Sequence, residues 1–257
     1  MGPSFWSTLG VMNRALVAAF FVACTPPSGA DDPTAIDPAS LLLPHSSTAE
    51  AAIDDLPVVI LTKTRLVLSG VPQASVPLPI GPESLAGPII DPLRQGLKDG
   101  HLQGHDMAVA IDSGATSEVA MEVLATCMDA GFSSFHIAVS HEGTTAQIPL
   151  SFGKPDVPGA KVLSASVFAG GVILSVPAGN VAPGCEGLGA GVTVSRVDGV
   201  IDRDQLSQCI ARVHKQHHTN AASVNVAKTT VFSDVVVLLD AMRHDAETTA
   251  IALGISP

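Results

Sequence analysis

The fold is decided by residues 109–131, VAIDSGATSEVAMEVLATCMDAG. A short apolar run ends at Asp112, and the small polar residues that follow it are of the kind that turn a chain. Apolar side chains then recur at helical spacing as far as Gly131, the residue type that most often follows a helix C-terminus. The stretch therefore predicts a strand, a tight turn and an amphipathic helix.

The same plan returns near the C-terminus at an offset of 115 residues, where Val109 and Ile111 align with Val224 and Val226. The apolar helix positions align on one face: Ala120, Val123, Leu124 and Cys127 with Val235, Leu238, Leu239 and Met242. An offset of 116 aligns two further predicted helices through Ile90, Leu93 and Leu97 with Leu206, Cys209 and Val213. This repeat predicts an α/β (α+β) fold of two tandem β-β-α-β-α-β units, each a small mixed sheet with two helices.

Five regions follow from this repeat and from the composition between its copies. Residues 1–24 are predicted to be a signal peptide or lipoprotein signal, and the Pro-rich residues 25–56 a disordered linker. The first domain spans 57–141, a second linker rich in Gly and Pro spans 142–160, and the second domain spans 161–257. Each domain is of ordinary size.

The N-terminal region contains ten consecutive apolar residues, 15–24, directly after Arg14. Ten residues are too few to cross a bilayer, but they suit the apolar core of a signal peptide. The last four residues, Phe21-Val22-Ala23-Cys24, look like a bacterial lipobox, which predicts that Cys24 carries the lipid. An ordinary signal peptide and an uncleaved anchor are the alternatives.

Composition excludes some functions. The chain of 257 residues is 46% hydrophobic, 14% charged and has a formal net charge of -11. A protein this acidic is a poor match for nucleic acid, because phosphate binding needs a basic surface. With one Trp and no Tyr, stacking platforms for bases or sugars are not expected.

Each unit resembles the periplasmic domain of the ExbD/TolR biopolymer-transport proteins. The resemblance is diffuse and is carried by Ala110-Ile111-Asp112, by Ala130-Gly131-Phe132 and by Phe232 with the helical run Val235–Arg243. It implies a non-enzymatic protein without cofactors on the periplasmic face of a bacterial envelope membrane. Such a protein would bind peptidoglycan or envelope partners of a proton-motive-force-coupled system, with a homodimer possible. The family's essential Asp lies in a transmembrane helix, and residues 15–24 contain no acidic residue, so the proton-relay role is not carried over.

Two alternatives compete with this interpretation. The run Asp112-Ser113-Gly114-Ala115-Thr116 matches the catalytic loop of retropepsin-like aspartic peptidases, in which two Asp carboxylates activate water. The second unit has Ala-Lys-Thr at 227–229 instead, so only a homodimer could supply a second Asp112. A non-catalytic Asp112 would satisfy free N–H groups at the helix start, together with Ser113. The other alternative, a periplasmic ligand-binding lipoprotein, would require a deep pocket between the units.

The remaining cysteines and histidines give one site prediction. Cys185 and Cys209 are predicted to form a disulfide, which an exported protein permits, unless Cys209 simply packs in the core. Cys127 is predicted to be a free thiol on a buried helix face. The cluster His214-Lys215-Gln216-His217-His218 lacks the converging ligands of a zinc site, and a solvated helix end is the preferred interpretation, so no metal ligand is assigned.

Overall fold

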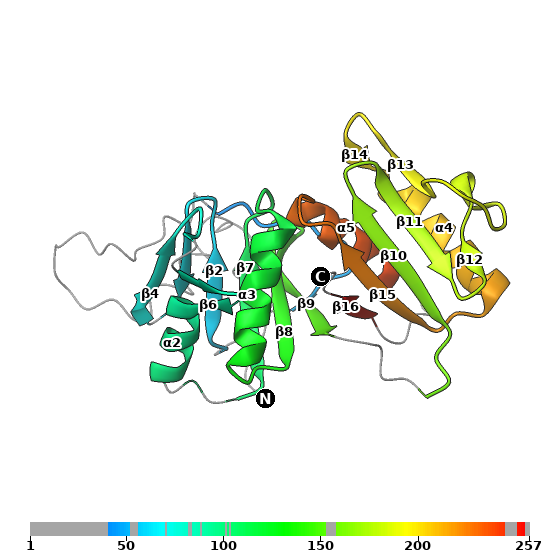
Figure 1. Ribbon diagram of the computed structural model, residues 1–257. Coiled ribbons are helices and arrows are strands. Elements are labelled where there is room, and N and C mark those ends of the chain that lie inside the picture. The colour runs from blue at the N-terminus through cyan, green and yellow to red at the C-terminus, as the bar shows by residue number, and fades with distance from the viewer. Residues whose placement is uncertain are drawn as a thin grey trace, which may run out of the picture.

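The computed structural model describes residues 41–51, 56–69, 71–81, 84–87, 89–100, 102, 104–152, 158–244 and 251–254. Within these ranges four α-helices and two mixed β-sheets give the α/β fold that the sequence predicts, divided between two similar units (Figure 1).

The first unit has strands in the order β4-β3-β2-β7-β8-β9. Their bounds are β2 (Val58–Leu61), β3 (Arg65–Leu68), β4 (Val71–Pro77), β7 (Asp106–Ile111), β8 (Ser134–His141) and β9 (Thr144–Phe152), with β1 (Glu50–Ala51) added to β9. The central strands β2, β7 and β8 are parallel, whereas β3, β4 and β9 are antiparallel to their neighbours within this unit. Its helices are α2 (Asp91–Asp99) and α3 (Ser117–Asp129), and a short hairpin of β5 (Leu85–Ala86) and β6 (Ile89–Ile90) precedes α2.

The second unit has strands in the order β14-β13-β11-β10-β15-β16. Their bounds are β10 (Val162–Phe168), β11 (Gly171–Val176), β13 (Val194–Val197), β14 (Val200–Ile201), β15 (Ala221–Val226) and β16 (Ile251–Gly254), with β12 (Gly179–Asn180) paired to β11. The helices are η3 (Pro183–Cys185), α4 (Arg203–His217) and α5 (Phe232–Arg243). The order β11-β10-β15-β16 corresponds to β3-β2-β7-β8 of the first unit.

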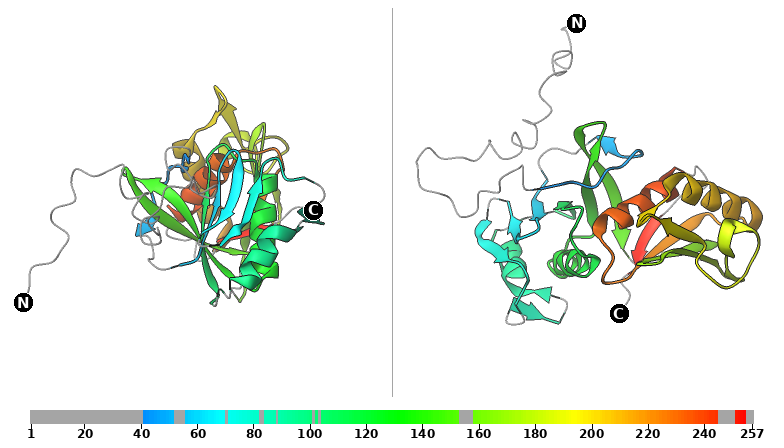
Figure 2. Two further views of the ribbon diagram at one scale, coloured as in Figure 1. Left: turned by 90° about the vertical axis from the view of Figure 1, so that its left-hand side faces the viewer. Right: turned by 90° about the horizontal axis from the view of Figure 1, so that it is seen from above.

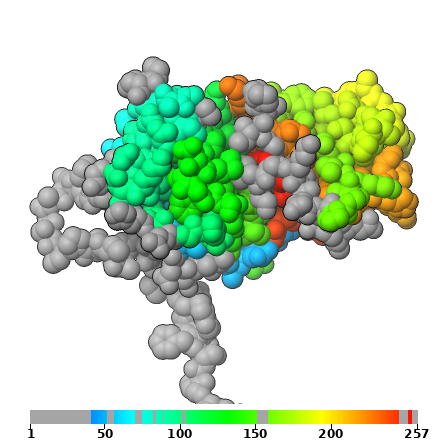
Figure 3. All heavy atoms as spheres, turned by 60° about the horizontal axis from the view of Figure 1, so that its bottom comes forward, coloured from blue at the N-terminus to red at the C-terminus, as the bar shows by residue number. Residues whose placement is uncertain are grey.

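The two sheets meet edge to edge, because β16 pairs in parallel with β9 through Ala252–Ser151 and Leu253–Phe152. In Figure 1, α2 and α3 lie in front of the first sheet, whereas α4 and α5 lie behind the second. The view from above in Figure 2 shows the same opposite placement of the helices. The space-filling view in Figure 3 shows the units as neighbouring lobes, green and cyan beside yellow and orange.

The repeated apolar positions form the core, as the 115- and 116-residue offsets predict. All fourteen repeat positions are buried: Ile90, Leu93, Leu97, Ala120, Val123, Leu124, Cys127, Leu206, Cys209, Val213, Val235, Leu238, Leu239 and Met242. Thirteen of them lie on the four helices, and Ile90, predicted to be helical, ends β6 as the N-cap of α2. Strands β7 and β15 themselves lie at the 115-residue offset, from Asp106 and Ala221 to Ile111 and Val226. The hydrophobic pattern therefore located both helix faces and the central strands correctly.

Two helix starts also follow their local sequence. The Asp202 carboxylate accepts a hydrogen bond from the Gln205 backbone N–H at 2.9 Å, which makes Asp202 the N-cap of α4. Pro92 lies in the first turn of α2, where its missing N–H removes no helical hydrogen bond.

Two segments that contain several prolines or glycines are strands. The linker predicted over 142–160 contains β9, in which Ala146, Ile148 and Leu150 alternate with less apolar residues and are buried. The stretch from Val71 to Pro77, which contains two prolines, is the edge strand β4, a position that tolerates them. Prolines and glycines in these segments obscured a period-2 pattern that is present in β9.

The linker predicted over 25–56 is wrong for the part that the structure describes. Residues 41–51, which we call the clasp, contact both units through hydrogen bonds and the pairing of β1 with β9. The clasp is structured although it has no apolar periodicity, because hydrogen bonds from polar and main-chain groups hold most of it in place. Residues 1–40, including the predicted signal and Cys24, lie outside the described residues.

Candidate functional site at the junction of the two units

The site is centred on Asp240 of α5, whose side chain is completely buried. Its carboxylate accepts hydrogen bonds from three consecutive residues of the clasp. The hydroxyls of Ser46, Ser47 and Thr48 donate at 2.5, 2.7 and 2.6 Å. The backbone N–H groups of Ser47 and Thr48 donate at 3.0 Å each, and Arg203 Nη1 lies 3.0 Å from Asp240 Oδ2. Six donors therefore compensate one buried charge.

These donors fix the protonation state of Asp240. Burial on its own would raise the pKa of this carboxyl group, because it disfavours the charged form. Hydrogen bonds from Ser46, Thr48 and Ser47 oppose burial and outweigh it, so the pKa of Asp240 is lowered well below its ordinary value of 3.8. The carboxylate is thus the form that binds the clasp at neutral pH.

A pH dependence of stability follows from this shift. Because the folded-state pKa of Asp240 is depressed, its contribution is present above the unfolded value of 3.8 and is lost as pH falls toward the folded value. We expect the difference in unfolding free energy between the wild type and Asp240→Asn to be constant from pH 7 to 5 and to shrink below about pH 4. Urea unfolding of both proteins at several pH values measures it. A difference that stays constant down to pH 2.5 would contradict the assigned role of the charge.

The other end of the clasp is bound by Asp112 at the carboxyl end of β7. Asp112 Oδ2 accepts a hydrogen bond from the Leu42 N–H at 3.0 Å, and Oδ1 accepts one from the Gly114 N–H at 2.9 Å. The Ser113 N–H donates to the Leu42 carbonyl at 2.7 Å. The clasp thus crosses the carboxyl ends of parallel strands, where ligands bind in open α/β sheets.

This environment bears on the peptidase alternative. Asp112 is fully buried, and each of its carboxylate oxygens already accepts a main-chain hydrogen bond. The residues after Thr116 form helix α3. A catalytic dyad needs a carboxylate that can reach water and a second carboxyl group. The geometry therefore favours a turn-forming and clasp-binding role for Asp112.

Asp112 and Asp240 are the two acidic anchors of the clasp, and further contacts between and beyond them complete the site. The Ser46 N–H donates to the Ser140 carbonyl at 3.0 Å, and His141 Nδ1 donates to the Ser46 carbonyl at 2.9 Å. Beyond the second anchor, Arg243 Nη2 donates to the Glu50 carboxylate at 2.6 Å. The first unit therefore binds both ends and the middle of the clasp, and the second unit binds it from His45 to Glu50. In the right panel of Figure 2 the blue clasp lies beside the green β8–β9 hairpin.

Under the clasp, the two strand-to-helix turns pair with each other reciprocally. The Ser117 N–H donates to the Thr230 carbonyl at 2.8 Å, and its equivalent at the 115-residue offset, Phe232, donates to the Ala115 carbonyl at 2.8 Å. A second equivalent pair joins Glu118 N–H to the residue 228 carbonyl and Ser233 N–H to the residue 113 carbonyl.

These bonds explain how both helices start without a side-chain cap. Neither Thr116 nor Val231, the N-cap residues of α3 and α5, makes a side-chain capping bond. The first two helical N–H groups are instead satisfied by carbonyls of the other unit. The prediction that Asp112 and Ser113 side chains satisfy these groups is therefore wrong, because Asp112 binds Gly114 and the clasp.

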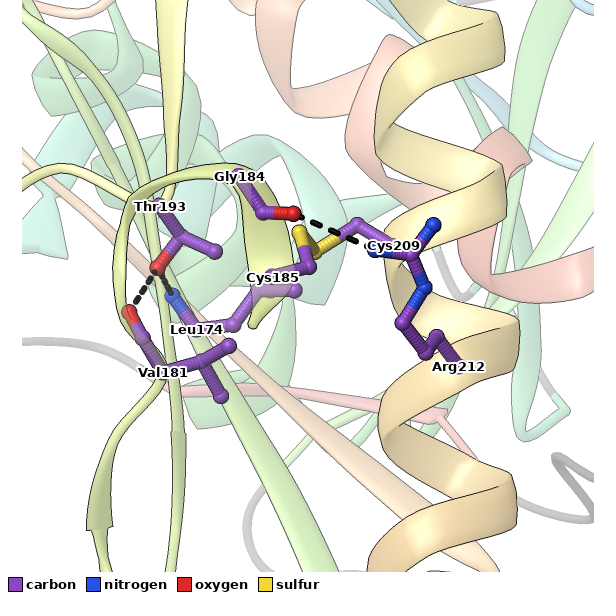
Figure 4. Close-up of a disulfide and its surroundings, with 7 residues drawn as sticks. All are labelled: Leu174, Val181, Gly184, Cys185, Thr193, Cys209 and Arg212. Atoms are coloured by element: carbon purple, nitrogen blue, oxygen red, sulfur yellow. Dashed lines mark hydrogen bonds between the residues drawn. A yellow bond between two sulfur atoms is a disulfide. The ribbon is translucent and has the colours of Figure 1, made fainter. Parts of the chain in front are cut away.

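The predicted disulfide between Cys185 and Cys209 is present, with a Cα–Cα distance of 5.6 Å (Figure 4). It joins η3 to the middle of α4, and Arg212 Nη1 donates to the Gly184 carbonyl at 3.2 Å beside it. In the same loop, Thr193 Oγ1 donates to the Val181 carbonyl and accepts from the Leu174 N–H. The disulfide thus fixes a loop with little secondary structure of its own onto a helix.

The other predicted site residues lie apart from the junction. Cys127 is a free buried thiol, as predicted, and burial raises its pKa to about 12, which makes it unreactive. His214 was assigned to a solvated helix end, but it is fully buried within α4 and contacts Thr219 through Nδ1. The part of the chain that the structure describes contains no group of three or more His, Cys, Asp or Glu placed to hold a metal ion.

Asp240, Arg203 and the clasp residues were not predicted as site residues. One signal was available, because Asp240 lies four residues after Val236 within an apolar helix and thus shares its buried face. At the 115-residue offset its counterpart is Ala125, so the charge is specific to the second unit. No local pattern links Asp240 to Ser46, which is 194 residues away.

No protein-family model matches the chain. Comparisons with curated proteins and with solved structures also return no match. Among the described residues, no helix combines the length and the apolar character that crossing a bilayer requires.

Proposed function

We propose that the chain is an exported, envelope-tethered protein that binds or assembles and does not catalyse. In this proposal its two units are tandem ExbD/TolR-like domains of β-β-α-β-α-β plan, and Cys24 carries the lipid that holds them at the periplasmic face of the membrane. The ligand is peptidoglycan or an envelope partner of a proton-motive-force-coupled system. The resemblance of the repeat carries the family assignment, which remains a proposal.

One observation carries the non-catalytic part of this proposal: the residues most suggestive of chemistry are used to join the units. Asp112 binds its own turn and the clasp, and the turn that contains it pairs with the equivalent turn of the second unit. The equivalent loop in the second unit keeps the pairing without an Asp. What the two copies share is therefore a scaffold.

The disulfide supports the proposed location. Structural disulfides form and persist in oxidising compartments and are uncommon in the cytosol of mesophiles. The Cys185–Cys209 bond closes a separation of 24 residues in a loop-rich region, where it has a structural use. This supports export, and it complements the signal-like residues 15–24.

Fractionation of a bacterium that expresses the full chain tests the proposal. We expect the wild type in the membrane fraction with Cys185 and Cys209 oxidised, and Cys24→Ala shifted to the soluble periplasmic fraction. Cys127→Ala is the matched control and is expected to stay with the membrane, because Cys127 is a buried free thiol of α3. A cytoplasmic chain with reduced Cys185 and Cys209 would overturn the proposal.

Sedimentation with purified peptidoglycan sacculi then separates the two ligand classes. We expect the exported chain to co-sediment and to be released by enzymatic digestion of the sacculi. If it stays in the supernatant, peptidoglycan is the wrong ligand, and the envelope-protein partner takes its place.

A further inference from the structure

The clasp is attached differently from the rest of the chain. Its contacts with Asp112, Asp240 and Ser140 are hydrogen bonds. Of its apolar side chains, Pro44 is buried, Leu41 and Leu43 are half-buried and Leu42 is 63% exposed. Ala49 packs against the core only in part. Segments with few buried apolar contacts open at a lower free energy than the core they cover. The clasp is therefore expected to open at a lower free energy than the sheets.

The site that the clasp fills is selective, because its occupant covers a charge. With the clasp in place the Asp240 side chain is fully buried, and among the described residues Arg203 is its one partner outside the clasp. A buried charge that loses its hydrogen bonds carries a large desolvation penalty. Any occupant that covers Asp240 must therefore donate several hydrogen bonds to its carboxylate. Ser47 and Thr48 do so, because each donates both its hydroxyl and its backbone N–H.

The binding geometry also requires an extended chain. The Ser46 N–H donates to the carbonyl of Ser140 in β8, and Glu50 and Ala51 pair with Gln147 and Ala146 of β9. Strand addition of this kind takes its affinity from main-chain groups and its specificity from a few side chains. Here the side-chain specificity comes from Asp240 and Arg203 in the second unit.

We propose that Asp240, Arg203 and the β8–β9 hairpin form a binding site for an extended, hydroxyl-rich peptide segment, which residues 41–51 fill as a built-in, releasable ligand. Since the clasp contacts Asp112 in one unit and Asp240 in the other, its occupancy stabilises the arrangement of the two units. Its release exposes the Asp240 site and removes one of the connections across the junction.

Amide hydrogen exchange on the intact chain tests whether the clasp is released from the folded protein. We expect the Ser47 and Thr48 amides to exchange faster than the amides of β7. Asp240→Asn should speed their exchange by roughly 10- to 100-fold, because charge-assisted hydrogen bonds are lost. The matched control is Asp234→Asn, on the same helix and also paired with an arginine, Arg196. It should change these two amides less than twofold.

Two results of that experiment would contradict the proposal that the clasp is released from the folded protein. One is wild-type exchange at Ser47 and Thr48 no faster than in β7, which would mean that the clasp opens only when the whole protein unfolds. The other is equal acceleration by Asp234→Asn and Asp240→Asn. Should Asp240→Asn not fold, the milder Ser47→Ala, which removes one hydroxyl donor at an exposed residue, replaces it with the same expected direction.

A labelled peptide then tests whether the site binds a segment. A specific protease sequence is inserted between residues 51 and 56 of the full chain. After cleavage, the N-terminal fragment that carries the clasp is removed by gel filtration, which leaves the site empty. A fluorescent peptide of residues 41–51 should bind the cleaved chain saturably. It should bind at least tenfold more weakly when Asp240 is Asn, and within twofold of wild type when Asp234 is Asn. A cleaved chain with an unchanged circular dichroism spectrum that does not bind the peptide would overturn the proposal.

Discussion

Replacing Asp240 with alanine is expected to lower the free energy of unfolding by about 3–5 kcal/mol, since one partner of a buried charge network is removed. The truncation leaves Arg203 without its carboxylate and the hydroxyls of Ser46, Ser47 and Thr48 without their acceptor. Urea unfolding at pH 7, followed by circular dichroism, measures the loss.

The control for that loss is Asp129→Ala. Asp129 ends helix α3, its side chain is 43% exposed, and its nearest cation, Arg94, lies 3.9 Å away. Exposed pairs of this kind contribute about 0–1 kcal/mol, so this variant should unfold close to wild type. If Asp240→Ala also lowers the free energy of unfolding by less than about 1 kcal/mol, the hydrogen bonds between Asp240 and the clasp contribute little to stability.

Removing the disulfide is the second large effect that we expect. For a separation of 24 residues, loop-closure entropy in the unfolded chain predicts that Cys185→Ser with Cys209→Ser costs about 3–4 kcal/mol. Cys209 is itself buried on α4, so the loss should not fall below this range. Thermal and urea unfolding of the oxidised wild type and of the double variant measure the difference.

Reduction supplies the internal control for this prediction. Dithiothreitol should destabilise the wild type toward the double variant and should leave the double variant unchanged, because Cys127 is a buried free thiol. A wild type whose stability does not respond to reduction would show that the bond does not constrain the chain.

The parts of the fold that the sequence predicts are those with a local period. The helical spacing of apolar residues predicts the buried face of α3 and its repeat in α5, and Val123 and Leu238 are buried as this spacing predicts. Asp202 was predictable as an N-cap for the same reason, since its partner lies only three residues away. Such features depend on neighbours in the chain.

The parts that the sequence did not predict depend on distant partners. Ser46 looks like a linker residue until Asp240, 194 positions later, is placed beside it by the packing of α5. The starts of α3 and α5 lack side-chain caps, and the missing acceptors are carbonyls of the other unit, 110 to 120 residues away in sequence. β9 was missed for a different reason, because Gly143 before it and the Gly and Pro residues at 153–159 after it made the segment resemble a linker.

The repeat had suggested that Asp112 is a turn residue, and the structure sharpens that interpretation. Its two carboxylate oxygens divide between the turn and Leu42 of the clasp. The two acidic anchors are not symmetric copies, since Ala125 stands opposite Asp240 and Ala227 opposite Asp112 in the alignment of the units. The clasp therefore binds a junction to which each unit contributes one carboxylate.

The central claim, that the clasp is bound through the Asp240 carboxylate, is tested most directly by a double-mutant cycle between Ser46→Ala and Asp240→Asn. The Ser46 hydroxyl lies 2.5 Å from Asp240 Oδ1, and both residues are buried. Unfolding free energies of the four proteins should give a coupling of about 1–3 kcal/mol, as expected for a hydrogen bond to a charged group. Additive losses, with a coupling below about 0.5 kcal/mol, would contradict this account.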